Sequence, residues 1–110
     1  MNYTYPAIFY KEDNGYSVQF PDIESAYTCG NSLSEAVKMA EDILSICLND
    51  YLSADKELPA PSDHADIVPE YDLPYQIIDI ESINPEDYWK NIPLKYKIIN
   101  HCLDFKNSFR

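Results

Sequence analysis

Two histidines and 19 carboxylates are the side chains of this 110-residue chain that could most readily do chemistry. An imidazole titrates near neutral pH and can act as a general acid or base. One hypothesis is therefore a stand-alone nuclease that uses His64 or His101. The sequence places no nucleophile next to either histidine, and no serine stands in a strand-to-helix elbow motif. We accordingly expect that the protein is not an enzyme.

Metal and cofactor chemistry finds equally little support. Carboxylates are so frequent that any pair could be called a metal site, and such a pairing means nothing without geometry. The three cysteines, Cys29, Cys47 and Cys102, lack the spacing of a zinc site or a disulfide framework. Two glycines are too few for a phosphate-binding loop, so we predict no metal and no cofactor. Scattered cysteines, without a signal segment or a run of ~18 apolar residues, predict a reduced, cytoplasmic location.

The distribution of charge is the strongest signal in the composition. The net charge is −11, and it is uneven along the chain. Residues 1–87 carry 3 basic and 18 acidic side chains (−15), whereas residues 88–110 carry 5 basic and 1 acidic side chain (+4). Phosphates repel a protein with this net charge, so we do not expect the protein as a whole to bind nucleic acid. The uneven distribution instead favours an acidic body that binds a basic partner, with simple solubility as the alternative.

A long amphipathic helix over residues 33–52 is the element around which a core can form. Its apolar residues recur at helical spacing and make one stripe, consisting of Leu33, Ala36, Val37, Ala40, Ile43, Leu44, Cys47, Leu48, Tyr51 and Leu52. The polar residues between them, which include Ser45 and Asn49, are expected on a solvated face. Ser32 and Glu35 have the spacing of a capping box, in which Ser32 accepts from residue 35 and Glu35 reaches back to residue 32.

Alternation of apolar and polar residues predicts four strands, at residues 3–10, 16–20, 26–29 and 75–81. In the first strand Tyr3, Tyr5, Ala7 and Phe9 are expected to share one face. Asn14-Gly15 predicts a type I′ hairpin turn, because both residues tolerate positive φ angles. Together these elements predict an α+β fold in which a single sheet has the helix on one face and leaves the other face open. An open apolar face favours a homo-oligomer, either a dimer or a tetramer.

Residues 53–74 form an acidic, proline-rich segment that we call the strap. It contains four prolines, six acids and one lysine, and it shows no apolar period. A loop of this length in a small domain is usually functional or mobile. We expect a single domain over residues 1–81, strap included, because the strand after the strap completes the sheet.

Residues 82–110 are predicted to form a short, basic, helical C-terminal segment. Asn84-Pro85-Glu86-Asp87 predicts the start of a helix. The basic residues of the segment are Lys90, Lys95, Lys97, Lys106 and Arg110. They support an alternative function, a transcriptional repressor whose C-terminal segment contacts the phosphates of operator DNA.

The order of these parts resembles the HicB family of antitoxins, from bacterial type II toxin–antitoxin systems. The matching pieces are Tyr5-Pro6-Ala7, Gly15-Tyr16-Ser17-Val18, Phe20-Pro21-Asp22, Tyr27-Thr28 with Gly30, then Leu33, Glu35-Ala36 and Ala40, Leu58-Pro59, Pro61-Ser62 and the stretch from Ile78 to Ile80. Two departures stand out. Ile23-Glu24-Ser25-Ala26 replaces the Leu-Pro-Gly-Cys step that is frequent in the family, and residues 82–110 lack the full DNA-binding motif in which members commonly end.

The resemblance implies a β-β-β-α-β domain, a partial ribonuclease-H-like fold with strand order 3-2-1-4 and the helix on one face. It implies no nuclease activity. The implied partner is a small basic HicA-like toxin that cleaves messenger RNA, and the antitoxin neutralises it by covering its active site. Acidic and aromatic side chains near the hairpin and the strap are the candidates for contact. They are Tyr10, Glu12, Asp13, Asp22, Glu24, Tyr27, Asp55, Glu57 and Tyr71.

Overall fold

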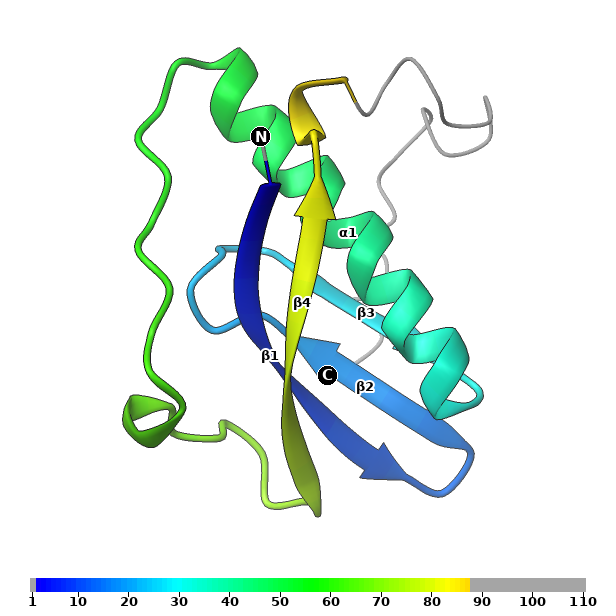
Figure 1. Cartoon of the computed structure of the whole chain (residues 1–110). Helices are drawn as coiled ribbons and strands as arrows, with labels where there is room; N and C mark the ends of the chain where they lie inside the picture. The colour runs from blue at the N-terminus through cyan, green and yellow to red at the C-terminus, as the bar shows by residue number, and fades with distance from the viewer. Residues whose placement is uncertain (1, 88–110) are drawn as a thin grey trace.

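The computed structural model describes residues 2–87, in which one long helix packs on a four-stranded antiparallel sheet (Figure 1). In chain order the elements are β1 (Asn2–Glu12), β2 (Gly15–Gln19), β3 (Tyr27–Gly30), α1 (Leu33–Ser53), the 3-10 helix η1 (His64–Asp66), β4 (Tyr75–Ile83) and the 3-10 helix η2 (Pro85–Asp87). The sheet order β3-β2-β1-β4 confirms the expected α+β topology. The proposed DNA contacts Lys90, Lys95, Lys97, Lys106 and Arg110, and also His101, lie outside the described residues.

The hydrophobic core lies between α1 and one face of the sheet. Tyr5, Ala7 and Phe9 of β1 belong to this core, as their alternation predicts, and Ile80 of β4 joins them. The stripe of α1 supplies the other half, with Ala36, Ala40, Ile43, Leu44, Cys47 and Leu48. Burial of a large apolar side chain contributes about 1.5–3 kcal/mol, so this layer is the main source of stability.

Two polar residues of α1 do not lie on the expected solvated face. Ser45 and Asn49 are both buried. The Ser45 hydroxyl shares a 2.7 Å hydrogen bond with the Ser82 hydroxyl of β4, and Asn49 Nδ2 donates to the Pro85 carbonyl oxygen at 2.9 Å. Packing of β4 and η2 against α1 therefore continues beyond residue 81, with the buried polar groups paired across the contact.

The predicted cap is present at the N-terminus of α1. Ser32 Oγ accepts a hydrogen bond from the Glu35 amide at 3.2 Å. The Glu35 carboxylate accepts from the amide of Asn31 at 3.1 Å, one residue before the expected partner. Both contacts satisfy amides that have no partner inside the first helical turn.

The β1–β2 turn is not the type I′ turn that was predicted at Asn14-Gly15. Glu12 pairs with Gly15, so the turn residues are Asp13 and Asn14, and neither has a positive φ. A type I′ turn needs positive φ at both central positions. Gly15 is instead a strand residue with φ of 150°, and a Cβ there would lie 2.3 Å from the carbonyl oxygen of Gly30. The close approach of β3 thus requires this glycine.

The second face of the sheet is not open, contrary to the expectation. The strap leaves the C-terminal end of α1, descends along one side of the molecule and returns to the start of β4 (Figure 1). Ile8 and Tyr10 alternate with the core residues of β1, yet each is only 1% exposed. Part of this cover is the strap, since Glu70 and Tyr71 contact Tyr10. An open apolar face therefore no longer supports self-association.

Candidate partner-binding surface

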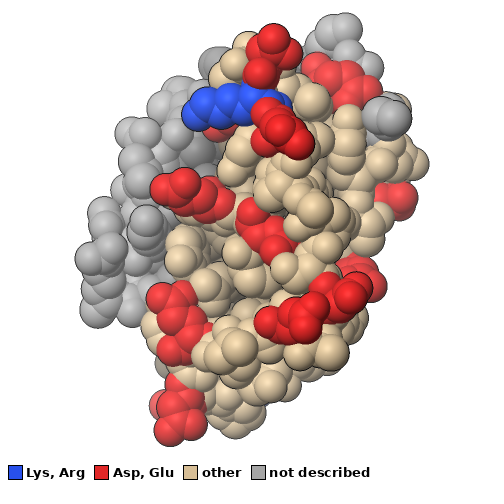
Figure 2. Space-filling model, turned by 90° about the vertical axis from the view of Figure 1, so that its left-hand side faces the viewer, with Lys and Arg blue, Asp and Glu red and all other residues tan. Residues whose placement is uncertain are grey.

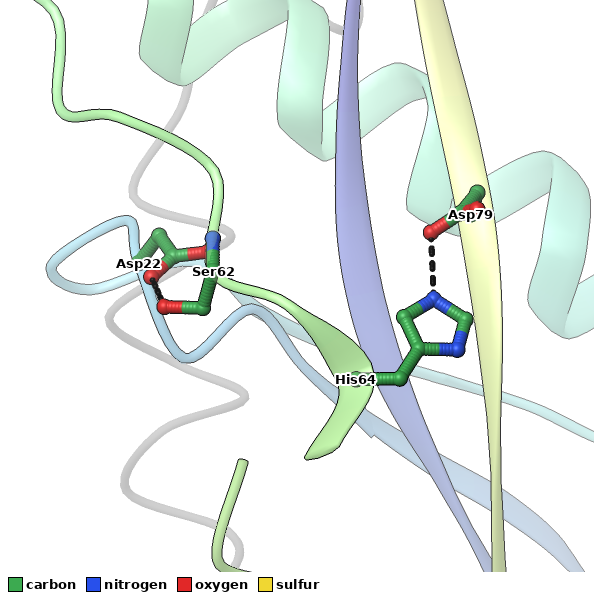
Figure 3. Close-up of polar contacts among 4 residues, drawn as sticks. All are labelled: Asp22, Ser62, His64 and Asp79. Atoms are coloured by element: carbon green, nitrogen blue, oxygen red, sulfur yellow. Dashed lines mark hydrogen bonds and ion pairs between the residues drawn. The ribbon is translucent and has the colours of Figure 1, made fainter. Parts of the chain in front are cut away.

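The strap is attached to the β2–β3 loop through Asp22. The Asp22 carboxylate accepts two hydrogen bonds from Ser62, one from the backbone amide at 2.9 Å and one from the hydroxyl at 2.5 Å (Figure 3). Hydrogen bonds to an ionised carboxylate are about twice as strong as neutral ones. Asp22 therefore fixes the middle of the strap, a role that its sequence context did not reveal.

The strap is attached to β4 through His64. Its Nε2 lies 2.7 Å from Oδ1 of Asp79 (Figure 3). The two side chains are 51% and 56% exposed, so solvent screens the pair and its contribution to stability is about 0–1 kcal/mol. The pair therefore joins η1 of the strap to β4.

Tyr10 anchors the last part of the strap from inside the sheet. Its hydroxyl accepts from the Glu70 amide at 2.8 Å and donates to Gln19 Oε1 at 3.1 Å, while Gln19 Nε2 donates to the Glu70 carboxylate at 2.6 Å. Burial is the main cause that raises the pKa of Tyr10 above its usual 10.0, although hydrogen bonds with the strap backbone act in the opposite direction. The Tyr71 ring stands edge-on to Tyr10 with centroids 5.2 Å apart, and the Tyr75 ring lies at 6.4 Å.

The hairpin tip lies beside the end of the strap. Glu12 and Asp13 are exposed, and together with Lys11, Leu73 and Pro74 they line a shallow hollow of about 480 Å³. The Lys11 amide donates to the Pro74 carbonyl oxygen at 2.7 Å, which holds the end of the strap next to β1. The tip thus presents carboxylates next to apolar side chains.

Carboxylates dominate the charged side chains on the side of the molecule along which the strap runs (Figure 2). Figure 2 shows acidic side chains scattered over this face, whereas basic ones are confined to one end. In residues 2–87 the sequence has only Lys11, Lys38 and Lys56 against 18 acids. A basic partner that approaches this side therefore meets an attractive field.

Four of the nine predicted contact residues come together at the hairpin end of the sheet. They are Tyr10, Glu12, Asp13 and Tyr71. Tyr27 lies on the same sheet face as Tyr10, because it pairs with Gln19, and Gln19 pairs with Ile8. Tyr10 itself is buried, so it supports this surface from below.

The remaining four predicted residues lie elsewhere. They are Asp22 and Glu24 in the β2–β3 loop, and Asp55 and Glu57 after α1, at the opposite end of the sheet from the hairpin (Figure 1). Sequence reasoning missed Leu73 and Tyr75, which are 39% and 48% exposed at the hairpin end. The sequence did offer a signal for them, because Leu73 and Tyr75 are large apolar residues on either side of Pro74, at the end of the acidic strap.

Comparison with known families gives a match over most of the described residues. The model of the HicB_like antitoxin of bacterial toxin–antitoxin systems matches residues 2–75. The chain belongs to the HicB-like antitoxin family. The matched region of this HicB-like chain runs from β1 to the start of β4 and so includes the strap. The resemblance inferred from the sequence is thereby confirmed.

Curated relatives of this HicB-like chain are longer than the region they share with it. It is 39% identical to antitoxin HicB 2 of Photorhabdus laumondii over 61 residues, which cover 56% of the chain and 44% of the relative. It is 31% identical over 80 residues to an uncharacterized 14.9 kDa protein of Haemophilus phage HP1, with 70% and 60% covered. The chain thus spans about half the length of the curated relatives it matches.

Solved structures with the same fold include toxin–antitoxin assemblies. A toxin–antitoxin complex from Streptococcus pneumoniae matches the HicB-like chain with a TM-score of 0.67 and 28% identity, covering 99% of this chain and 97% of the other. The crystal structure of antitoxin HicB3 matches with a TM-score of 0.61 at 20% identity, covering 97% and 82%, and therefore supports the fold alone. In residues 2–87 no helix combines the length and apolarity needed to cross a bilayer.

Proposed function

We propose that this chain is the antitoxin of a type II toxin–antitoxin pair, and that it binds a small basic HicA-like toxin and covers the toxin's messenger-RNA-cleaving site. The observation that carries the proposal is the family match over residues 2–75. The Streptococcus pneumoniae relative, at 28% identity, comes from a toxin–antitoxin complex, which supports the same role. An antitoxin of this kind works by binding and performs no chemistry of its own.

Charge supports the choice of partner. A protein that cleaves RNA needs a basic surface for the phosphates, and residues 1–87 of this chain carry a charge of −15. Opposite charges accelerate encounter, and buried aromatic side chains then supply most of the affinity. An acidic protein seated on the RNA-binding surface excludes the substrate both sterically and electrostatically.

The test is to locate a reading frame for a small basic protein beside the gene for this chain and to co-express the two proteins. The toxin alone is expected to arrest growth, and simultaneous expression of this chain is expected to relieve the arrest. In vitro, an equimolar amount of this chain should stop RNA cleavage by the purified toxin. Growth arrest that persists when both proteins are present would reject the proposal.

A second candidate function is repression of transcription, favoured by the net charge of +4 in residues 88–110. Contacts between these basic residues and phosphates would make DNA binding weaken steeply with salt. Gel shifts on the upstream promoter at two salt concentrations measure this dependence. If Lys95→Glu/Lys97→Glu leaves the binding unchanged, the basic segment is not the DNA contact.

A further inference from the structure

Exposed apolar side chains are concentrated where the strap enters β4. In residues 2–87 the large hydrophobic side chains that are exposed are Val68, Tyr71, Leu73, Tyr75 and Ile83. Four of these five lie within residues 68–75. Single exposed apolar residues are normal on protein surfaces, but a contiguous group indicates a site of interaction.

Three of these residues lie at the hairpin end of the sheet, and we call them the Tyr71–Tyr75 patch, which consists of Tyr71, Leu73 and Tyr75. The rings of Tyr71 and Tyr75 both lie against the ring of Tyr10, with centroid distances of 5.2 and 6.4 Å. Leu73 stands between them in the chain and lines the hollow at the hairpin tip. The patch therefore adjoins the tip directly.

The patch is ordered before any partner binds. The Tyr10 hydroxyl accepts from the Glu70 amide on one side of the patch, and the Lys11 amide donates to the Pro74 carbonyl oxygen on the other. These contacts fix the main chain before and after Leu73. A preordered surface loses less conformational entropy on association, so more of its apolar contact contributes to affinity.

Carboxylates lie next to the Tyr71–Tyr75 patch, two of them in the hollow that Leu73 lines. Glu12, Asp13 and Asp72 are all exposed. Lys11, the lysine of this stretch, turns its Nζ back to the Glu12 carbonyl oxygen at 2.8 Å and lies 5.1 Å from the centroid of the Tyr16 ring. An apolar centre within an acidic rim complements a basic protein surface and repels nucleic acid.

We propose that the Tyr71–Tyr75 patch and the hairpin-tip carboxylates Glu12 and Asp13 are the surface on which the basic toxin docks, an inference that rests on the proposed function. The patch supplies the apolar anchors, and the two carboxylates steer the toxin toward it. Asp22 and His64 hold the strap that carries the patch. Glu57, at the opposite end of the sheet, lies outside this interface.

Surface plasmon resonance at two ionic strengths tests this surface, with the full chain as the analyte and the purified small basic toxin from the co-expression test immobilised. Leu73→Ser/Tyr75→Ser is expected to raise Kd by about tenfold or more, chiefly through faster dissociation. Glu12→Lys/Asp13→Lys is expected to lower the association rate by about tenfold at low salt, and by less at high salt.

Matched controls change the same chemistry away from the patch. Ile83→Ser removes an exposed apolar side chain at the other end of β4, and Glu41→Lys/Glu57→Lys reverses two exposed charges on α1 and at the start of the strap. Each control should change binding less than its counterpart. Thermal melting followed by circular dichroism verifies that every variant is folded at the temperature of the binding measurement.

The outcomes separate this inference from the proposed function. A wild-type chain that does not bind the toxin overturns both. If the wild-type chain binds and Leu73→Ser/Tyr75→Ser binds equally well, the docking surface alone is overturned. The same holds if Glu41→Lys/Glu57→Lys lowers the association rate more than Glu12→Lys/Asp13→Lys does. Analytical ultracentrifugation of the free chain tests self-association. A dimer that Leu73→Ser/Tyr75→Ser abolishes would assign the patch to that dimer and would also overturn the inference.

Discussion

The two faces of the sheet are covered in different ways. On one face, α1 buries a continuous apolar layer that includes Phe9 and Leu44. On the other face, the strap has no regular structure except η1, and Asp22, Tyr10 and His64 attach it through individual hydrogen bonds. Apolar burial accumulates with area, whereas one hydrogen bond adds about 1 kcal/mol net. The α1 layer should therefore set global stability, while the strap can open locally.

This difference bears on function because the strap carries the Tyr71–Tyr75 patch. Segments that bind partners are usually drawn from the less stable parts of a fold. A few polar contacts are sufficient to order such a segment. The comparison of the two faces therefore predicts a graded series of mutational effects.

The largest effect is expected from Leu44→Ala in the α1 layer. Leu44 is fully buried, and truncation of a buried leucine lowers the free energy of unfolding by about 2–5 kcal/mol. Urea denaturation measures the loss. Ile83→Ala, which truncates an exposed residue of β4, is the control and should stay within about 0.5 kcal/mol of wild type.

The next effect is expected from Asp22→Ala on the strap side. Loss of the two hydrogen bonds from Ser62 should lower stability by about 1.5–3 kcal/mol and accelerate hydrogen exchange of the Ser62 amide. Glu24→Ala, in the same loop, is the matched control. If Asp22→Ala destabilises the protein more than Leu44→Ala, the contrast between the two faces is wrong.

A smaller effect is expected from Tyr10→Phe. The substitution keeps the ring but removes the acceptor of the Glu70 amide, which costs about 1 kcal/mol. Tyr75→Phe, at the ring that also lies against Tyr10, provides the comparison and should cost less. Equal losses in the two variants would show that the hydroxyl of Tyr10 does not hold the strap.

The raised pKa of Tyr10 predicts that the protein becomes less stable at alkaline pH. Because burial raises its pKa above 10.0, the folded state keeps the phenol proton at a pH where the unfolded chain loses it. The free energy of unfolding should therefore fall as the pH rises above about 10, until the folded pKa is passed. Urea midpoints across this range should fall less steeply in Tyr10→Phe. Part of the decline should persist, since burial also raises the pKa of Tyr5.

The smallest effect is expected at the His64–Asp79 pair. Both partners are about half exposed, so a double-mutant cycle with His64→Ala and Asp79→Ala should give a coupling below about 1 kcal/mol. The coupling should decrease further in high salt. A coupling above about 2 kcal/mol would show that the strap is attached more firmly than the comparison assumes.

Much of the fold could be predicted because its signals are local. The stripe of α1, the Ser32 cap and the alternation in β1 each depend on residues within a few positions of one another, and the structure contains all three. The predicted type I′ turn at Asn14-Gly15 was wrong because Gly15 is a strand residue, where the close approach of the Gly30 carbonyl oxygen from β3 leaves no room for a side chain. The solvated position predicted for Ser45 failed for the same reason, since its partner is Ser82 of β4.

The candidate site likewise combines features that the sequence shows with features that depend on contacts between distant residues. From the sequence alone came the acidic character of residues 1–87, the predicted contacts at Glu12, Asp13 and Tyr71, and the resemblance to the HicB family, because composition and short motifs are properties of the chain itself. Only the tertiary structure decided that the strap covers the second face, that Asp22 holds it there, and that Leu73 reaches the hairpin tip. Those outcomes depend on hydrogen bonds and packing between residues about 40–60 positions apart, such as Asp22 with Ser62 and Tyr10 with Glu70, and no local pattern encodes such pairs.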